Sequence, residues 1–559
     1  MPVTPLVSDG CWIFCFWLII SPVLPSSIND PIFTNVIQRD VPNKNEPTLG
    51  QMRPLKKAFL SNRFITCNDG SQAGFYLRKS THSKKWIIFL EGGWYCYDHH
   101  SCRNRWIKQR HYMTSSNWPE TKDVGGILSP NMQENPFWWN ANHVFVPYCT
   151  SDSWSGSKRP SKQGMFSFMG SSVVLQVVRD LIPLGLENST DLLLTGSSAG
   201  GTGVMINLDF VEELLHEEFM LKKLRVKGVT DSGWFLDRTP FAPTKPAVEA
   251  IRKGMELWQG RVPRRCREQY LDEPWRCYFG YRIYPTLKAP LFVFQWLFDE
   301  AQMDADNVGA PETKQQWDYI HKMGDALRHS FQNVSAVFAP SCISHSVLTK
   351  KDWQLVKIDD ISLSDALHCW EQKTNRRRIK RRKNNRRKDF QRQSNNALKN
   401  LENVDVNVKE PDSIQEFANN DNRRRRKNQR KHHRRKNKGQ HSNKRKANLL
   451  RTTNSLPLTN NFSLAEHHQS RKVSSQKQRR SFNRHCVHRR LERCSWPQCN
   501  HSCPKLHNPI TGEEIDFIEL LKSFGLNMER MASALGIDIE TLNNMDHGEL
   551  LNLLTPQGN

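Results

Sequence analysis

A Gly-x-Ser-x-Gly motif sets Ser198 between Gly196 and Gly200. The apolar residues before it predict a buried strand, and the residues after Gly203 predict an amphipathic helix. A nucleophilic serine on such a turn needs glycine at both offsets, because side chains there would collide with the strand or the helix. The backbone N–H of Ala199, at the helix start, is then free to bind an oxyanion. The motif therefore predicts acyl transfer at Ser198; the alternative is a glycine-rich turn without chemistry.

A serine nucleophile also needs a base and an acid that orients the base. In α/β-hydrolases these follow the serine in the order Asp/Glu, then His. Asp299 follows the long apolar run 290–298, whereas Asp231 follows a shorter run and is interpreted as a cap or a pocket-wall residue. His345, in a predicted loop, is the favoured base. The competing histidines, both in predicted helices, are His368 and His216.

A second pair of glycines, Gly92 and Gly93, follows the predicted strand 86–90. Hydrolases of this type place the other half of the oxyanion hole at such a turn, because the backbone N–H groups there can face the cleft. The alternative is an ordinary tight turn.

Strands and helices alternate along the part of the chain that must position these groups. This alternation favours a mainly parallel sheet covered by helices on both faces, with residues 61–370 as the hydrolase body and residues 28–60, rich in Pro and Asn, as a mobile leader. The predicted strands are 74–78, 86–90, 143–149, 192–194, 226–230 and 290–298, and the predicted helices lie at 171–179 and after Gly203.

The charge of the chain is concentrated in residues 371–485. This segment holds 35 Lys and Arg but only 9 Asp and Glu, in a chain whose net charge is +25. It has few apolar residues, so it cannot bury enough surface to order itself, and we expect a disordered insertion. Its cluster Arg423–Arg426 could be cut by a basic-site protease.

Residues 486–559 are Cys-rich and then helical, and their apolar residues (Phe517 to Leu521, Met528 to Leu535, Ile539 and Leu542) are interpreted as core contacts that complete the body.

Residues 1–27 resemble a signal peptide, because a short apolar run ends at small residues. No Lys or Arg precedes the run, so a retained anchor is the alternative. No later stretch has ~18 uninterrupted apolar residues, and we expect no transmembrane segment after signal removal.

Twelve cysteines follow the signal peptide, and their even number predicts up to six disulfides in an oxidising compartment. Zinc at Cys494, Cys499 and Cys503 is the alternative, but the spacing lacks a CxxC pair. Four sequons predict glycosylation, at Asn188, Asn333, Asn461 and Asn500.

Five stretches together resemble the pectin acetylesterase family: 91–96, 196–203, 231–237, 295–302 and 338–345. The resemblance covers residues 60–370 and 486–559, and it implies an α/β-hydrolase fold. It implies a triad of Ser198 as nucleophile, Asp299 as orienting acid and His345 as base, with an oxyanion hole formed by Gly93, Trp94 and Ala199. The basic insertion departs from the family pattern.

Within that family the chain is similar to a secreted carboxylesterase that removes a palmitoleoyl group from a serine of Wnt proteins. This similarity implies an apolar acyl pocket, for which Trp94, Phe235 and Phe279 are candidates; simple core packing is the alternative for each aromatic. No metal and no cofactor is expected.

Two other functions remain open. One is an O-acetyl esterase that acts on carbohydrate. The other is a secreted protein whose insertion binds heparan sulfate of glypican-like proteoglycans, with an incidental hydrolase body. The secretory signal and the lack of interleaved aromatics argue against nucleic acid as a partner. A solvated linker without a specific partner is the plainer alternative for the insertion.

Overall fold

The computed structural model describes residues 53–160, 166–242, 247–309, 311, 313–375, 486–506, 528–535 and 537–545. The predicted signal peptide, most of the basic insertion, Asn461 and residues 517–521 therefore lie outside the described residues.

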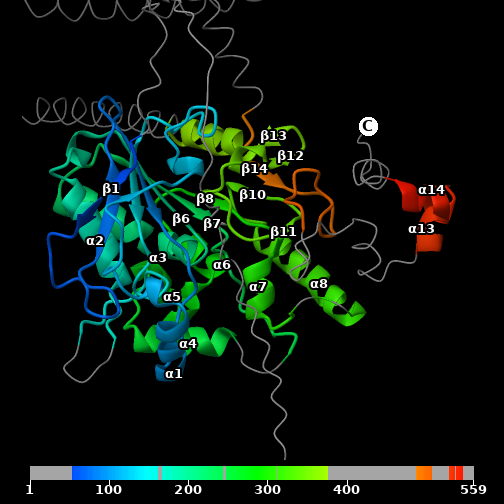
Figure 1. Ribbon diagram of the computed structural model, residues 1–559, viewed down its shortest axis with the longest axis horizontal. Helices are drawn as coiled ribbons and strands as arrows, with labels where there is room; N and C mark the ends of the chain where they lie inside the picture. The colour runs from blue at the N-terminus through cyan, green and yellow to red at the C-terminus, as the bar shows by residue number, and fades with distance from the viewer. Residues whose placement is uncertain are drawn as a thin grey trace, which may run out of the picture. The chain divides into compact units, whose positions relative to one another are not determined.

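The body is built on one ten-stranded sheet with the order β14-β10-β8-β7-β6-β3-β5-β2-β1-β4 (Figure 1). The seven strands from β14 to β5 are mutually parallel, and β2, β1 and β4 add antiparallel strands at one edge. The predicted mainly parallel sheet is confirmed. The strands are β1 (Leu55–Phe59), β2 (Gly74–Arg78), β3 (Lys85–Leu90), β4 (Thr121–Lys122), β5 (Asn142–Val146), β6 (Asp191–Ser197), β7 (Arg225–Asp231), β8 (Leu291–Phe294), β10 (Val337–Ala339) and β14 (Arg489–Leu491).

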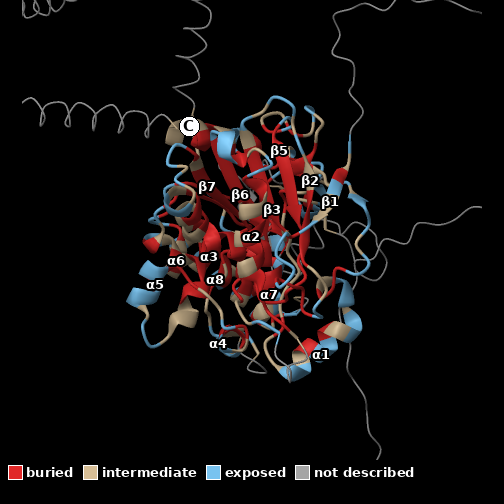
Figure 2. Cartoon of the chain, turned by 90° about the vertical axis from the view of Figure 1, so that its left-hand side faces the viewer, coloured by how far each residue is buried: buried red, intermediate tan, exposed pale blue. Residues whose placement is uncertain are grey.

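Both faces of the sheet are covered, as its apolar runs require. In β6, Leu192 and Leu194 join the core shared with α2 (Gly170–Leu181) and α3 (Ala199–Glu213). Leu193 joins the opposite core, to which the helical residues 363–375 contribute. Figure 2 shows the central strands and α3 as buried, whereas α1 (His99–Lys108) and α5 (Arg264–Gln269) carry exposed residues.

The remaining helices lie between the strands or in the C-terminal region. They are α4 (Ala247–Leu257), α6 (Gly280–Ile283), α7 (Glu300–Ala305), α8 (Lys314–Ser330), α13 (Met528–Leu535) and α14 (Ile539–Asn544). Of the C-terminal residues predicted to be core, Met528 and Leu542 are buried, but Ile539 is 42% exposed and that assignment is wrong. Ile539 begins α14, where a side chain has fewer neighbours than in the helix interior.

Three predicted boundaries are also wrong. Residues 55–59 form β1 and pair with β2, so the leader ends before residue 55 rather than at 60. The helix that begins at residue 363 continues to Asn375, because Glu371 is buried and pairs with Lys227 and Lys85, so the insertion begins later than 371. The apolar run 290–298 is two strands, β8 and β9 (Phe298–Asp299).

All twelve cysteines from Cys67 to Cys503 form disulfides, so the prediction of six is confirmed and the zinc alternative is excluded for Cys494, Cys499 and Cys503. The pairs are Cys67–Cys149, Cys96–Cys102, Cys266–Cys277, Cys342–Cys503, Cys369–Cys486 and Cys494–Cys499. Such disulfides are typical of proteins that mature in an oxidising compartment. Across the described ranges, no helix combines the length and the apolar character needed to cross a membrane.

Candidate active site

Ser198 lies on the sharp turn between β6 and α3. Its φ of 58° is in the left-handed region, which residues other than glycine rarely adopt. Helix α3 can pack directly on β3 because Gly200 has no side chain. A Cβ on Gly200 would lie 2.0 Å from the carbonyl oxygen of Leu90. The backbone N–H of Ser198 donates to the carbonyl oxygen of Asp231 at 2.8 Å, which fixes the turn against β7. The local geometry is that of a nucleophile elbow.

Asp299 and His345 are brought together by a short parallel pairing. Strand β9 pairs with β11 (Ile343–Ser344), so that Ser344 lies opposite Asp299 and His345 follows directly. The Nδ1 of His345 lies 3.0 and 3.1 Å from the two carboxylate oxygens of Asp299. Asp299 is fully buried, and the side chain of His345 is 23% exposed. The carboxylate can therefore hold the ring with Nδ1 protonated and leave Nε2 as a proton acceptor.

The surroundings of His345 are acidic. Burial alone would lower the pKa of His345, but the carboxylate of Asp299, through its charge and its hydrogen bond, outweighs burial, and Asp231 and Glu300 add to the effect. The net result is a pKa of His345 above its ordinary value. A base with a raised pKa is a stronger proton acceptor once it is neutral.

Asp231 holds the nucleophile turn and the histidine loop together. Its Oδ2 accepts hydrogen bonds from the hydroxyl of Ser197 at 2.5 Å and from the backbone N–H groups of Val347 and Leu348 at 2.9 and 3.0 Å. Its Oδ1 accepts the hydroxyl of Ser232 at 2.9 Å. The prediction that Asp231 is a cap or pocket-wall residue missed this connecting role, which only the parallel register of β6 and β7 brings about.

The turn of residues 92–94 packs on the nucleophile. A Cβ on Gly92 would lie 2.8 Å from the Cβ of Ser198, and Gly93 and Trp94 have φ values of 139° and 60°. Ala199 begins α3, so its backbone N–H is at the helix N-terminus. The three residues predicted to form the oxyanion hole (Gly93, Trp94 and Ala199) thus belong to two backbone segments that meet at Ser198.

A largely apolar cavity opens beside Ser198. The candidates Trp94, Phe235 and Phe279 all line it. The lining residues that the sequence did not indicate are Tyr95, Leu236, Ala247, Ile251, Tyr278, Gln302 and Ala305. Ala247 and Ile251 come from α4, which carries no motif that could have marked it.

The competing histidines have other partners. Nε2 of His216 is 2.8 Å from the carbonyl oxygen of Leu224, and the ring of His368 stacks on Phe137 with a centroid distance of 4.1 Å.

Among the described residues, the one group with metal-ligand atoms close together is Cys369, Cys486 and His488. Its two cysteines share a disulfide and offer no thiolate.

The predicted glycosylation sites differ in accessibility. Asn188 and Asn333 are exposed, but Asn500 is buried and its amide nitrogen donates to the carbonyl oxygen of Lys357 at 2.7 Å and to Glu492. A glycan is attached through that nitrogen, so Asn500 does not fit the predicted role in the folded chain.

Comparisons with known proteins identify relatives over most of this chain. A palmitoleoyl-protein carboxylesterase NOTUM from Drosophila melanogaster is 47% identical over 627 residues, which covers 94% of this chain and 90% of the relative. The human palmitoleoyl-protein carboxylesterase NOTUM is 47% identical over 328 residues, or 57% of this chain and 66% of that protein. A crystal structure of the Wnt deacylase Notum from Drosophila matches with a TM-score of 0.57 at 61% identity and covers 58% of this chain and 94% of its own.

The family model described as pectinacetylesterase matches residues 50–385, a range that contains the elbow at Ser198, the Asp299–His345 pair and the turn of residues 92–94. With that match and relatives of this identity over most of its length, the chain belongs to the pectinacetylesterase family.

Proposed function

We propose that this chain is a serine carboxylesterase that hydrolyses the O-palmitoleoyl serine ester of Wnt proteins, with Ser198 as nucleophile, His345 as general base and Asp299 as the orienting acid. By removing the acyl group it would inactivate Wnt and so restrain Wnt signalling. The observation that carries the proposal is the apolar cavity that opens beside the elbow serine, because a long acyl chain needs such a pocket and an acetyl group does not.

The reaction is a two-step acyl transfer. Nε2 of His345 takes the proton of the Ser198 hydroxyl as its oxygen attacks the ester carbonyl carbon. Backbone N–H groups of the 92–94 turn and of Ala199 stabilise the oxyanion. The bond to the substrate serine breaks as His345 returns the proton to that oxygen, and water then attacks the acyl-enzyme with His345 again as base. Throughout, Asp299 stabilises the imidazolium.

A Wnt-derived peptide with O-palmitoleoyl serine tests the proposal. We expect the native chain to remove the acyl group, as mass spectrometry of the peptide would show, and Ser198→Ala to lose about 10⁴-fold or more in kcat. Deacylation by Ser198→Ala at the native rate would contradict the assignment of the nucleophile.

A sugar O-acetyl esterase is the second candidate, favoured by the family description. Acetyl and octanoyl esters of one alcohol separate the two functions. Substitution of Ile251, on the cavity wall, by Trp should reduce hydrolysis of the octanoyl ester and leave the acetyl ester nearly unchanged. If Ile251→Trp instead reduced only the hydrolysis of the acetyl ester, the result would favour the sugar O-acetyl esterase.

We further propose that the basic insertion, which holds 34 Lys and Arg against 8 acidic residues over residues 376–485, binds heparan sulfate and holds the secreted enzyme at cell surfaces. Many lysine and arginine contacts to sulfates predict binding that weakens steeply with salt. Retention on heparin at 0.15 M salt should be lost when residues 376–485 are deleted, whereas ester hydrolysis should persist. Unchanged retention would contradict this proposal.

A further inference from the structure

Arg105 is a buried cation close to the active site. It lies on α1 and is 6% exposed. Within the part of the chain that the structure describes, no carboxylate forms an ion pair with it. Its guanidinium donates instead to three uncharged oxygens: the hydroxyl of Ser151 at 2.8 Å, the amide oxygen of Gln109 at 3.0 Å and the backbone carbonyl oxygen of Gly93 at 2.5 Å. A buried charge without a counterion is costly, so its presence calls for a specific role.

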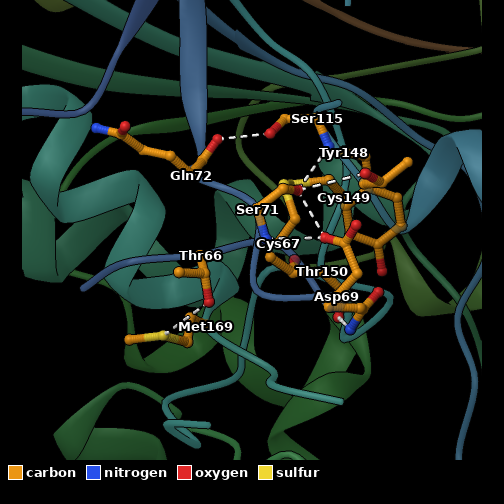
Figure 3. The surroundings of a disulfide bond; sticks show 12 residues. Thr66, Cys67, Asp69, Ser71, Gln72, Ser115, Tyr148, Cys149, Thr150 and Met169 are labelled. Atoms are coloured by element: carbon orange, nitrogen blue, oxygen red, sulfur yellow. Dashed lines mark hydrogen bonds between the residues drawn. A yellow bond between two sulfur atoms is a disulfide. The ribbon is translucent and has the colours of Figure 1, made fainter. Parts of the chain in front are cut away.

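The surroundings of Arg105 hold the guanidinium in one position. It lies over the rings of Tyr112 and Tyr148, at 5.1 and 5.8 Å from their centroids. The hydroxyl of Ser151, which accepts from Arg105, donates to Asn68 at 2.7 Å. The backbone N–H of Asn68 in turn donates to the carbonyl oxygen of Cys149 at 2.9 Å. Figure 3 shows the Cys67–Cys149 disulfide that anchors this region.

The helix that carries Arg105 is also bonded covalently to the 92–94 turn region. Cys102 on α1 forms a disulfide with Cys96, three residues after Gly93. The ring of Tyr112, which contacts the guanidinium, also packs on Gly93, where an added Cβ would lie 2.7 Å from the ring. Arg105, Tyr112 and the disulfide therefore fix the Gly93–Trp94 peptide from one side.

The direction of that peptide matters for catalysis. In a trans peptide the carbonyl oxygen and the following N–H point in opposite directions, and no described peptide is cis. Because Arg105 holds the carbonyl oxygen of Gly93, the N–H of Trp94 must point away from Arg105. Trp94 and Ser198 line the same cavity, so the reacting ester binds next to the Gly93–Trp94 peptide. The positive charge also polarises the peptide and makes its N–H a stronger donor.

We propose that Arg105 is a positioning residue for the oxyanion hole: its guanidinium holds the Gly93–Trp94 peptide so that the N–H of Trp94 faces the oxyanion that forms at Ser198. This proposal rests on the proposed serine esterase activity. It explains both the buried unpaired cation and the left-handed backbone of Trp94, which has a φ of 60°.

Arg105→Gln tests the proposal, because glutamine removes the charge and shortens the side chain. Loss of an oxyanion donor costs about 10²–10³-fold in kcat, so loss of its support should cost roughly 10-fold or more, with KM for an octanoyl ester nearly unchanged. An octyl trifluoromethyl ketone forms a tetrahedral oxyanion on the serine, and its affinity should fall by the same factor as kcat. The affinity for octanoic acid, which needs only the acyl pocket, should not change.

Arg78→Gln is the matched control. Arg78 is a half-buried arginine that also donates to backbone carbonyl oxygens, those of Leu128 and, at 3.3 Å, Arg53, but it lies on β2 and contacts no active-site residue. It should lower the melting temperature without changing kcat or ketone affinity. Arg105→Lys keeps the charge, so it should recover part of kcat and part of the affinity for the ketone. If Arg105→Gln does not fold, the lysine variant carries the test.

The outcomes separate this proposal from the one on which it rests. Full kcat and full ketone affinity in Arg105→Gln or, if that does not fold, in Arg105→Lys, while Ser198→Ala is inactive, would overturn the role of Arg105 alone. Activity in Ser198→Ala would overturn the proposed function. A fall in octanoic acid affinity that matches the fall in kcat would show a general loss of structure and would also overturn the positioning role.

Discussion

Asp299 accepts hydrogen bonds from four groups, and this arrangement determines what a replacement at this position would do. Oδ1 accepts the backbone N–H groups of Ala301 and Gln302, at 3.0 and 3.2 Å, and Oδ2 accepts the side-chain amide of Gln295 at 2.9 Å. Both oxygens face His345. The oxygen of Gln295 accepts the N–H of Trp234, so its amide cannot turn around without losing that bond.

Asp299→Asn should therefore impair the base without removing it. The two backbone donors keep the amide oxygen at the Oδ1 position, so the NH₂ group takes the Oδ2 position and favours the wrong tautomer of His345. We expect kcat to fall roughly 10⁴-fold, as for other triad aspartates, with little change in KM. Asp306→Asn is the control, because Asp306 is buried beside Gln302 but does not contact His345. Equal losses in the two variants would contradict the role of Asp299.

The raised pKa of His345 predicts the acid limb of the pH profile. The base must be neutral to accept the proton of Ser198, so kcat/KM should rise with pH through a value above about 6.5. The charged groups that face the ring are Asp299, Asp231, Glu300 and Asp304. Glu300→Gln should move this limb to lower pH, and Asp318→Asn, on the exposed side of α8, should not. A limb below 6.5 in the native chain would contradict the prediction.

The same pKa shift has the opposite effect on stability. A histidine whose pKa is higher in the folded chain than in the unfolded chain stabilises the fold below the unfolded value. This contribution is lost as the pH rises from about 6.5 through the folded pKa. The activity gained over this window is thus accompanied by a loss of stability from the same residue.

At the scale of elements, the end of β7 connects the two halves of the site. Asp231→Ala would leave the N–H groups of Val347 and Leu348 without their buried acceptor, and each such group costs about 1–3 kcal/mol. We expect the free energy of unfolding to fall by about 3 kcal/mol or more, with a loss of kcat because the loop of His345 is no longer held. Asp231→Asn keeps an oxygen at this position and should cost only about 1 kcal/mol. Urea unfolding measures the free energy of unfolding of each variant. Equal losses in Asp231→Ala and Asp231→Asn would contradict the connecting role.

The elements around the nucleophile could be predicted from sequence because their signals are local. The runs 86–90 in β3 and 192–194 in β6 are uninterrupted and apolar, and the motif at Ser198 needs no distant residue. Asp299 followed from chain order. The split of 290–298 into β8 and β9 could not be predicted, because the pairing of β9 with β11 joins segments 45 residues apart.

Other parts of the site give no local signal at all. Arg105 lies in a polar helix, and its role depends on the Cys96–Cys102 disulfide and on the direction of one peptide. Ile251 reaches the acyl cavity from α4, which has no motif. Such contacts follow from the packing of elements against each other rather than from their own composition.

At the scale of the whole molecule, the segment 486–506 returns to the body after the insertion and supports the loop of His345, the proposed general base. Strand β14 pairs with β10, and the side-chain oxygen of Gln498 accepts the backbone N–H of Ile343, two residues before His345, at 2.9 Å. Two disulfides, Cys369–Cys486 and Cys342–Cys503, bond the segment to the body. The returning segment therefore needs no continuous chain through the insertion to stay in place.

A single protease site placed within residues 376–485 tests this independence. After the cut, we expect the two chains to stay together on a non-reducing gel and the esterase activity to remain within about twofold, since the cut removes none of the contacts that hold residues 486–506. The same cut in a variant with Cys369→Ser, Cys486→Ser, Cys342→Ser and Cys503→Ser should release the C-terminal fragment on denaturation and lower the activity, because each lost disulfide removes about 2–5 kcal/mol of stability. The uncut form of that variant is the control for the disulfides alone. Loss of activity on cutting the native chain, with both disulfides intact, would show that the insertion itself supports the site, and the basic segment would then have a structural role in addition to any role in binding.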